Sequence, residues 1–105
     1  RDYTYVADIV DGIARALDWT GAREPRFGIV NLGNSAPVAL SALVATIAAA
    51  LDRQAILQHL PMQPGDVERT FADIAQAKSL LGWQPRTTLA DGIAQQVDWA
   101  RRRHG

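Results

Sequence analysis

Apolar residues recur at helical spacing in the first part of the chain. They follow the 3.6-residue period of a helix with one apolar face, which is expected to end near Asp18. The positions that share this face are Val6, Ile9, Val10, Ile13 and Leu17. Asp8 lies near the start of the helix, where a carboxylate suits the exposed backbone N–H groups and the positive end of the helix dipole.

Three further helices are predicted along the chain. The second covers residues 40–51, with Ser41 or a neighbour near its N-cap. The third is short and runs from about Ile74, with Asp73 as its N-cap. Gly82 supplies the left-handed position after its last turn, and Trp83 is placed to fold back over that end.

The fourth helix begins after Thr88, because Thr88 and Asp91 resemble a capping box with aspartate in place of the usual glutamate. Arg101, Arg102 and Arg103 close this helix, where cations suit the negative end of the dipole. Alternatively, the three arginines could form a tail that binds nucleic acid. The neutral charge of the chain favours the simpler interpretation, a solvated helix end.

Short runs of β-branched and aromatic residues predict a few strands between the helices. The stretches are residues 3–6, 27–32 and, more weakly, 55–60. The predicted fold class is therefore α/β, with about four helices and a few short strands in one small domain over residues 1–105. Burial in so short a chain is limited, so the free energy of unfolding is expected at or below about 5 kcal/mol.

Composition excludes several classes of function. The chain has 105 residues, 11 basic and 11 acidic, so a polyanion-binding surface is not expected. It has no cysteine, which excludes disulfides and thiolate metal sites. No apolar run has membrane-spanning length and no signal peptide is evident, so a cytoplasmic location is expected. Because the chain opens on Arg1 without a methionine, we expect a piece of a longer protein.

The sequence contains no convincing catalytic or metal-binding set. His59 and His104 lack companions at ligand spacing. Neither tyrosine near the N-terminus is followed by lysine four residues on, and no glycine-rich dinucleotide fingerprint is present. Gly28 and Gly33 have the outer spacing of a phosphate loop but lack the Lys-Ser/Thr that must follow.

Two side chains remain as candidates for binding a nucleotide. Arg1 precedes a predicted strand, and a guanidinium held on a rigid element can grip a phosphate or carboxylate through two hydrogen bonds. Pro64 and Gly65 suit the centre of a type II turn, which would expose Asp66 to two neighbouring hydroxyls such as those of a ribose. The simpler alternatives are a surface arginine and a turn aspartate that bonds its own backbone.

Four motifs occur in order along nearly the whole chain. They are Arg1-Asp2-Tyr3-Thr4-Tyr5-Val6-x-Asp8, Asn31-Leu32-Gly33-Asn34, Pro64-Gly65-Asp66-Val67, and Ala72-Asp73-Ile74 with Leu81-Gly82-Trp83-x-Pro85. Together they resemble the C-terminal portion of the extended short-chain dehydrogenase/reductases, the NAD-dependent nucleotide-sugar epimerases and dehydratases. The local sequence around Met62-Gln63-Pro64 is most similar to that of the UDP-glucuronate 4-epimerase branch.

The resemblance implies roles for single residues. Arg1 matches the family arginine that contacts the nucleotide diphosphate, and Asp66 matches the aspartate near its ribose. Gln63 stands where galactose-type epimerases have an arginine, which favours the glucuronate-type branch. Asp8 matches a structural position. No residue of the chain matches a catalytic one.

The resemblance also implies what the chain lacks. The NAD-binding Rossmann domain would precede Arg1, so this segment would bind a UDP-sugar, hold no cofactor itself and be inactive alone. We expect it to form a homo-oligomer through exposed apolar surface. The alternative is a free-standing helical interaction module that keeps the fold without the ligand. A helix-turn-helix DNA binder is disfavoured by the balanced charge.

Overall fold

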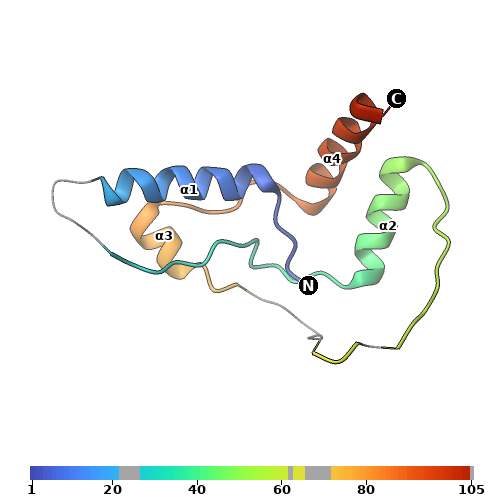
Figure 1. Ribbon diagram of the computed structural model, residues 1–105, viewed down its shortest axis with the longest axis horizontal. Helices are drawn as coiled ribbons and strands as arrows, with labels where there is room; N and C mark the ends of the chain where they lie inside the picture. The colour runs from blue at the N-terminus through green and yellow to red at the C-terminus, as the bar shows by residue number, and fades with distance from the viewer. Residues whose placement is uncertain (22–26, 62, 66–71, 105) are drawn as a thin grey trace.

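The described residues, 1–21, 27–61, 63–65 and 72–104 of a computed structural model, form four helices joined by extended segments (Figure 1). The helices are α1 (Val6–Thr20), α2 (Leu40–Leu51), α3 (Ala75–Leu81) and α4 (Leu89–His104). All four predicted helices are confirmed, and the bounds differ by at most two residues from those expected. No described residue lies in a β-strand, so the prediction of an α/β fold is wrong for this part of the chain.

The stretches predicted as strands do not pair with other strands among the described residues. Tyr5 has extended dihedral angles before α1, and neither residues 27–32 nor residues 55–60 form a hydrogen-bonded ladder. Ile56 is fully exposed and Leu60 is 68% exposed. A strand is defined by the neighbour that accepts and donates its backbone hydrogen bonds. The described part of the chain supplies no such neighbour, which is why local β-propensity does not become a sheet.

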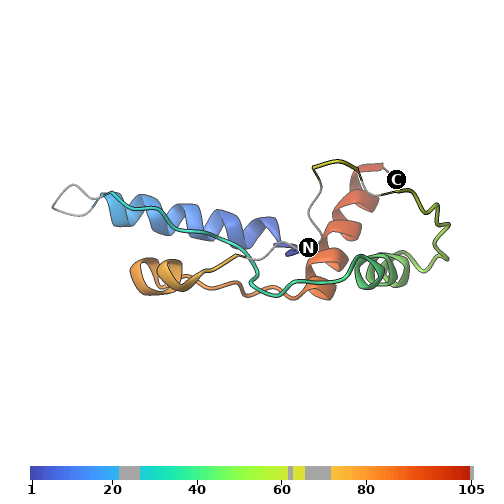
Figure 2. The same ribbon diagram turned by 90° about the horizontal axis from the view of Figure 1, so that it is seen from below.

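The helices pack as two pairs, one at each end of a flat molecule. α1 contacts α3, and α2 contacts α4, while the N-terminus lies between the pairs (Figure 1). The molecule measures 54 × 36 × 18 Å, and the thin dimension is evident from below (Figure 2). Because one helix with its side chains is about 10 Å across, 18 Å leaves room for no more than two layers.

Side chains bond the first turns of α3 and α4, and a glycine ends α3; the N-cap of α3 is Ile74, one residue after the predicted Asp73. The Ala75 N–H donates to the Asp73 carboxylate at 3.0 Å, and Gly82 adopts the left-handed φ of 62° after α3. The Asp91 N–H donates to the Thr88 hydroxyl at 3.2 Å before α4. The N-cap of α2 is Ala39, two residues before Ser41, and no side chain caps it.

The buried core is small and lies between α1 and α3. Trp83 and Ala77 are completely buried and Ile74 is nearly so. Val30 and Leu32 pack against this cluster from the extended segment that follows α1. The indole N–H of Trp83 donates to the Asp8 carbonyl at 2.8 Å. The prediction that Trp83 folds back over the end of α3 is confirmed, because its side chain is fully buried and its backbone N–H donates to the Ala77 carbonyl at 3.2 Å.

The chain exposes more surface than a compact monomer of its mass. Its radius of gyration is 17.0 Å, against about 13 Å for a compact domain of this length. Its accessible surface is 8250 Å², against about 5,800 Å² for a folded monomer of 11.4 kDa. Within the described residues, the helices are too short or too polar to cross a lipid bilayer.

Candidate functional site

The extended stretch before α1 connects segments from the whole chain, beginning at Arg1. The N-terminal amino group of Arg1 donates to the Val38 carbonyl at 2.8 Å, and the Val38 N–H donates back to the Arg1 carbonyl at 2.7 Å. This reciprocal pair fixes the backbone that carries the Arg1 guanidinium, although the residue itself is exposed. Arg1 is therefore held on a defined backbone, as a bidentate contact to an anion requires.

Asp2 and Thr4 hold the turn at residues 33–35 against this stretch. The Asp2 carboxylate accepts hydrogen bonds from the backbone N–H groups of Ser35 at 2.9 Å and Ala72 at 3.2 Å. The Thr4 hydroxyl accepts one from the Asn34 N–H at 3.0 Å. Two side chains two residues apart on an extended segment share one face. Three segments distant in sequence therefore meet beside Arg1.

Gly33 allows this close meeting. A Cβ atom built on it would lie 2.5 Å from the Cβ of Ala72 and 3.2 Å from the Asp2 carboxylate. An open hollow of about 410 Å³ lies at the same junction. It is lined by Asp2, Thr4, Val30, Asn31, Leu32, Gly33 and Ala72. The hollow is a polar candidate for ligand binding among the described residues.

Asp8 ties the N-terminal stretch to the segment before α4. Its carboxylate accepts backbone N–H bonds from Arg86 at 3.1 Å and Thr87 at 3.0 Å, and the Thr87 hydroxyl donates to it at 3.3 Å. Asp8 is 7% exposed and caps no N–H of its own helix. The prediction that Asp8 is structural is confirmed. The Tyr5 hydroxyl completes the connection by donating to the Gln95 amide oxygen at 3.1 Å.

The structure describes two of the three predicted site residues, Arg1 and Gln63. Arg1 lies at the junction described above. Gln63 is exposed and directly precedes the Pro64-Gly65 turn, in which Gly65 has the positive φ of 88° that a type II turn needs. Asp66 lies outside the described residues, so its relation to Arg1 stays a prediction.

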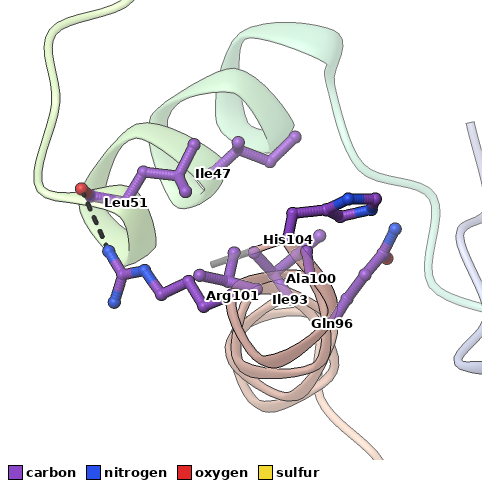
Figure 3. A pocket seen from close by; sticks show the side chains of 8 residues that line it. Ile47, Leu51, Ile93, Gln96, Ala100, Arg101 and His104 are labelled. Atoms are coloured by element: carbon purple, nitrogen blue, oxygen red, sulfur yellow. Dashed lines mark hydrogen bonds between the residues drawn. The ribbon is translucent and has the colours of Figure 1, made fainter.

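A second, larger hollow lies between α2 and α4. It has a volume of about 670 Å³, and none of the predicted site residues lines it. Its lining is mostly apolar and comprises Ile47, Leu51, Ile93, Gln96, Val97, Ala100, Arg101 and His104. Arg101 bridges the two helices by donating to the Leu51 carbonyl at 3.4 Å (Figure 3). An apolar groove with a basic rim suits a hydrophobic segment better than a diphosphate.

Among the described residues, neither histidine has a ligating companion. His59 is exposed in the segment between α2 and the Pro64-Gly65 turn, and His104 lies at the end of α4. Within the described ranges, no three His, Cys, Asp or Glu side chains gather closely enough to hold a metal ion.

Sequence reasoning missed Asp2 and Thr4 as the residues that assemble the junction. A signal was available, since polar side chains at alternate positions of an extended stretch face the same way. Their backbone partners could not be found, because Ser35 and Ala72 are 33 and 70 residues from Asp2 along the chain.

Comparison with known proteins identifies the family. The family model described as GDP-mannose 4,6 dehydratase matches residues 1–96. The chain belongs to this family. The resemblance to the nucleotide-sugar epimerases and dehydratases of the extended short-chain dehydrogenase/reductases is thereby confirmed.

Relatives of this GDP-mannose 4,6 dehydratase family member include two curated proteins. The protein MJ1055 of Methanocaldococcus jannaschii is 41% identical over 99 residues, which are 94% of this chain and 29% of the relative. The probable UDP-glucuronate 4-epimerase of Rhizobium meliloti (strain 1021) is 37% identical over 115 residues, 94% of this chain and 33% of the relative.

A solved structure shares the fold. MoeE5 in complex with UDP-glucuronic acid and NAD superposes with a TM-score of 0.88 at 31% identity, over 98% of this chain and 33% of MoeE5. This family member therefore spans about a third of the proteins that it matches.

Proposed function

We propose that this chain is the C-terminal, nucleotide-sugar-binding part of an NAD-dependent UDP-uronate or UDP-hexose 4-epimerase, most like UDP-glucuronate 4-epimerase. The observation that carries the proposal is the fold shared with MoeE5, whose structure contains UDP-glucuronic acid and NAD. In this proposal residues 1–105 are one domain, a Rossmann domain lies upstream of Arg1, and the protein is cytoplasmic.

The contacts around Arg1 support a role in binding the diphosphate. Its backbone is fixed by the pair with Val38, and the next residue, Asp2, lines the polar hollow together with Thr4. The proposal assigns the diphosphate to the Arg1 guanidinium and the ribose to Asp66. Gln63 is the third residue assigned to substrate binding, with an amide where galactose-type epimerases have an arginine, as in the glucuronate-type branch.

The residues of this chain do not fit NAD. The helix that follows the N-terminal extended stretch begins at Val6 after Tyr3-Thr4-Tyr5, without the glycines that let a pyrophosphate approach a helix N-terminus. Hydride chemistry therefore belongs to the NAD-binding part of an intact epimerase. This chain contributes the binding and orientation of the UDP-sugar.

Calorimetric titration of UDP tests the site assignment. We expect measurable binding by the wild-type chain, and at least a tenfold weaker affinity for Arg1→Ala and Asp66→Ala, because each removes a charged hydrogen-bonding group worth about 1.5–3 kcal/mol. Arg53→Ala is the matched control, since Arg53 is an exposed arginine just after α2. Equal affinities for all four proteins would eliminate the assignment.

A turnover assay tests the predicted inactivity of the isolated chain. The chain has no Tyr-x-x-x-Lys pair and no cofactor loop, so UDP-glucuronate incubated with it and with added NAD should remain unchanged. Formation of UDP-galacturonate by the pure chain would contradict the proposal.

The second candidate is a helical interaction or oligomerisation module without ligand. It is favoured by the excess of exposed surface, about 2,500 Å² above that of a compact monomer, of the order that large protein–protein interfaces bury. Both readings predict self-association of the isolated chain, which sedimentation velocity would detect as a dimer at high concentration. UDP affinity separates them, because the module would have none.

A further inference from the structure

Two neighbouring residues at the start of the chain hold the same distant segment. Arg1 exchanges two backbone hydrogen bonds with Val38, of 2.8 and 2.7 Å, and the Asp2 carboxylate accepts one of 2.9 Å from the Ser35 N–H. Ser35 and Val38 are three residues apart in the segment that leads into α2, beside the N-terminus (Figure 1). The backbone of residues 1–2 is therefore joined to residues 35–38 at two points.

The second point fixes what the first leaves open. A reciprocal pair of backbone hydrogen bonds joins two segments at one place along each. The stretch before α1 could still turn about that place and carry the Arg1 side chain with it. The bond from Ser35 to Asp2 removes this freedom, because it joins the same two segments three residues away from Val38.

Asp2 also sets the direction in which its neighbour leaves the backbone. Successive side chains of an extended segment point to opposite sides. Asp2 and Thr4 both point toward the turn at residues 33–35, because they accept the N–H groups of Ser35 and Asn34. The side chain of Arg1 therefore starts from the opposite side of the stretch, and Arg1 is exposed.

Ser35 is held in an unusual conformation at this contact. Its φ of 56° lies in the left-handed region, which residues other than glycine rarely adopt and which persists only where surrounding contacts maintain it. The oxygen Oδ2 of Asp2 accepts the Ser35 N–H and also the Ala72 N–H at 3.2 Å. Hydrogen bonds to a carboxylate are stronger than those between neutral groups. Asp2 therefore maintains the turn that leads to the partner of Arg1.

We propose that Asp2 is a positioning residue for diphosphate binding, which acts by holding the backbone that carries Arg1. This inference rests on the proposed function, in which the Arg1 guanidinium contacts the diphosphate of a UDP-sugar. A guanidinium whose backbone is fixed before the ligand arrives loses less freedom on binding, so it grips an anion more tightly. Asp2 itself does not contact the ligand in this proposal.

The charge of Asp2 gives the proposal a sign that an experiment can read. A carboxylate next to a diphosphate site repels the ligand, so its removal should strengthen UDP binding if Asp2 had no other role. Loss of positioning acts in the opposite direction. Weaker UDP binding after the negative charge has been removed would therefore report that Arg1 is no longer held in place.

The test titrates the 105-residue chain with UDP and follows binding by nuclear magnetic resonance, which also shows that each variant is folded. Asp2→Ala should weaken UDP binding at least fivefold. In an Arg1→Ala background the same substitution should change UDP binding less than twofold, because the group that Asp2 positions is already absent. A residue that only stabilised the fold would cause equal losses in the two backgrounds.

Asp73→Ala is the matched control. Its carboxylate also accepts a backbone N–H, from Ala75 at 3.0 Å, but this bond lies within its own segment. The variant loses the same charge as Asp2→Ala, and its UDP affinity should change less than twofold.

Asp2→Asn keeps the proposal testable if Asp2→Ala does not fold. Both backbone N–H groups donate to the same oxygen of Asp2, so the amide oxygen of asparagine can accept both. The UDP affinity of Asp2→Asn should therefore stay within twofold of the wild-type value. A fivefold loss in this variant would show that the charge of Asp2 matters and not its hold on the backbone, and would overturn the inference.

Three further results would overturn the inference while the wild-type chain still binds UDP and the proposed function stands. They are an unchanged or stronger affinity in Asp2→Ala, equal losses in the wild-type and Arg1→Ala backgrounds, and a loss of the same size in Asp73→Ala. Absence of UDP binding by the wild-type chain would instead eliminate the proposed function, and this inference with it.

Discussion

The indole N–H of Trp83 donates a 2.8 Å hydrogen bond to the backbone carbonyl of Asp8, 75 residues earlier in the chain. The carboxylate of the same aspartate accepts hydrogen bonds from the backbone N–H groups of Arg86 and Thr87. One residue on α1 therefore positions both the core tryptophan and the entry to α4. The Asp8 carboxylate thus links the α1–α3 pair to the segment that leads into α4, and the Tyr5–Gln95 hydrogen bond links the stretch before α1 to α4 itself.

Removing Trp83 should unfold or nearly unfold the chain. Trp83 is the largest fully buried side chain, and Trp→Ala substitutions in cores cost about 3–5 kcal/mol. Trp83→Phe should cost about 1–3 kcal/mol, because the buried Asp8 carbonyl loses its donor. Urea unfolding followed by circular dichroism measures both. Trp99→Phe is the control, since Trp99 is 54% exposed, and a comparable loss there would contradict the importance of the Trp83 contact.

Asp8→Asn should destabilise the chain by about 1–3 kcal/mol. The carboxylate accepts three hydrogen bonds, two of them from backbone N–H groups on the same oxygen. An amide oxygen can keep both backbone bonds but lacks the negative charge that strengthens them, and its NH₂ group replaces the oxygen that accepts from the Thr87 hydroxyl. The matched variant is Asp11→Asn, one turn away. Asp11 makes only a partly exposed ion pair with Arg15, of the kind worth about 0.3–0.5 kcal/mol. Equal midpoints in urea for the two variants would show that the Asp8 contacts add nothing.

Gly33→Ala should disrupt the junction beside Arg1. The new methyl group would lie 2.5 Å from the Cβ of Ala72, which is attached to the backbone and cannot rotate away. Overpacking of this kind costs about 1–3 kcal/mol. Gly21→Ala is the control, because its nearest neighbour would be at 3.4 Å and its φ of −81° suits alanine. The thermal midpoints of the two variants compare the sites directly.

Asp2→Ala should remove the hydrogen bonds that hold the turn at residues 33–35 and the backbone at Ala72 against the N-terminal stretch. Two backbone N–H groups lose their acceptor, so the amides of Ser35 and Ala72 should exchange at least tenfold faster with deuterium, as monitored by nuclear magnetic resonance. The amide of Asn34, held by Thr4, should change less. Asp18→Ala, at an exposed position of α1, should leave all three amides as they are.

The four helices and two of their caps could be predicted from the sequence because their causes are local. Apolar spacing in α1, the Thr88 side chain before α4 and the left-handed Gly82 after α3 each act within a few residues. Family membership could also be inferred from the sequence, since the order of the motifs is independent of how they meet in space.

The strands and the junction could not be predicted in this way. Residues 27–32 and 55–60 have strand-like sequences, but a strand exists only beside a second strand, and local propensity says nothing about whether one is present. The meeting of Asp2 with Ser35 and Ala72 depends on chain segments that return from far along the sequence.

The sequence alone determined where the helices begin and end to within two residues, which positions are apolar and which family the chain belongs to. Only the tertiary structure decided which side of each helix is covered. The periodicity of α1 shows that an apolar side exists, whereas packing against Trp83 and Leu32 selects the Asp8–Gly12 side for burial. The physical reason is that burial is a property of neighbours in space. Trp83 and Leu32 lie against the Asp8–Gly12 side, while Val6, Val10, Ile13 and Leu17 are left exposed among the described residues.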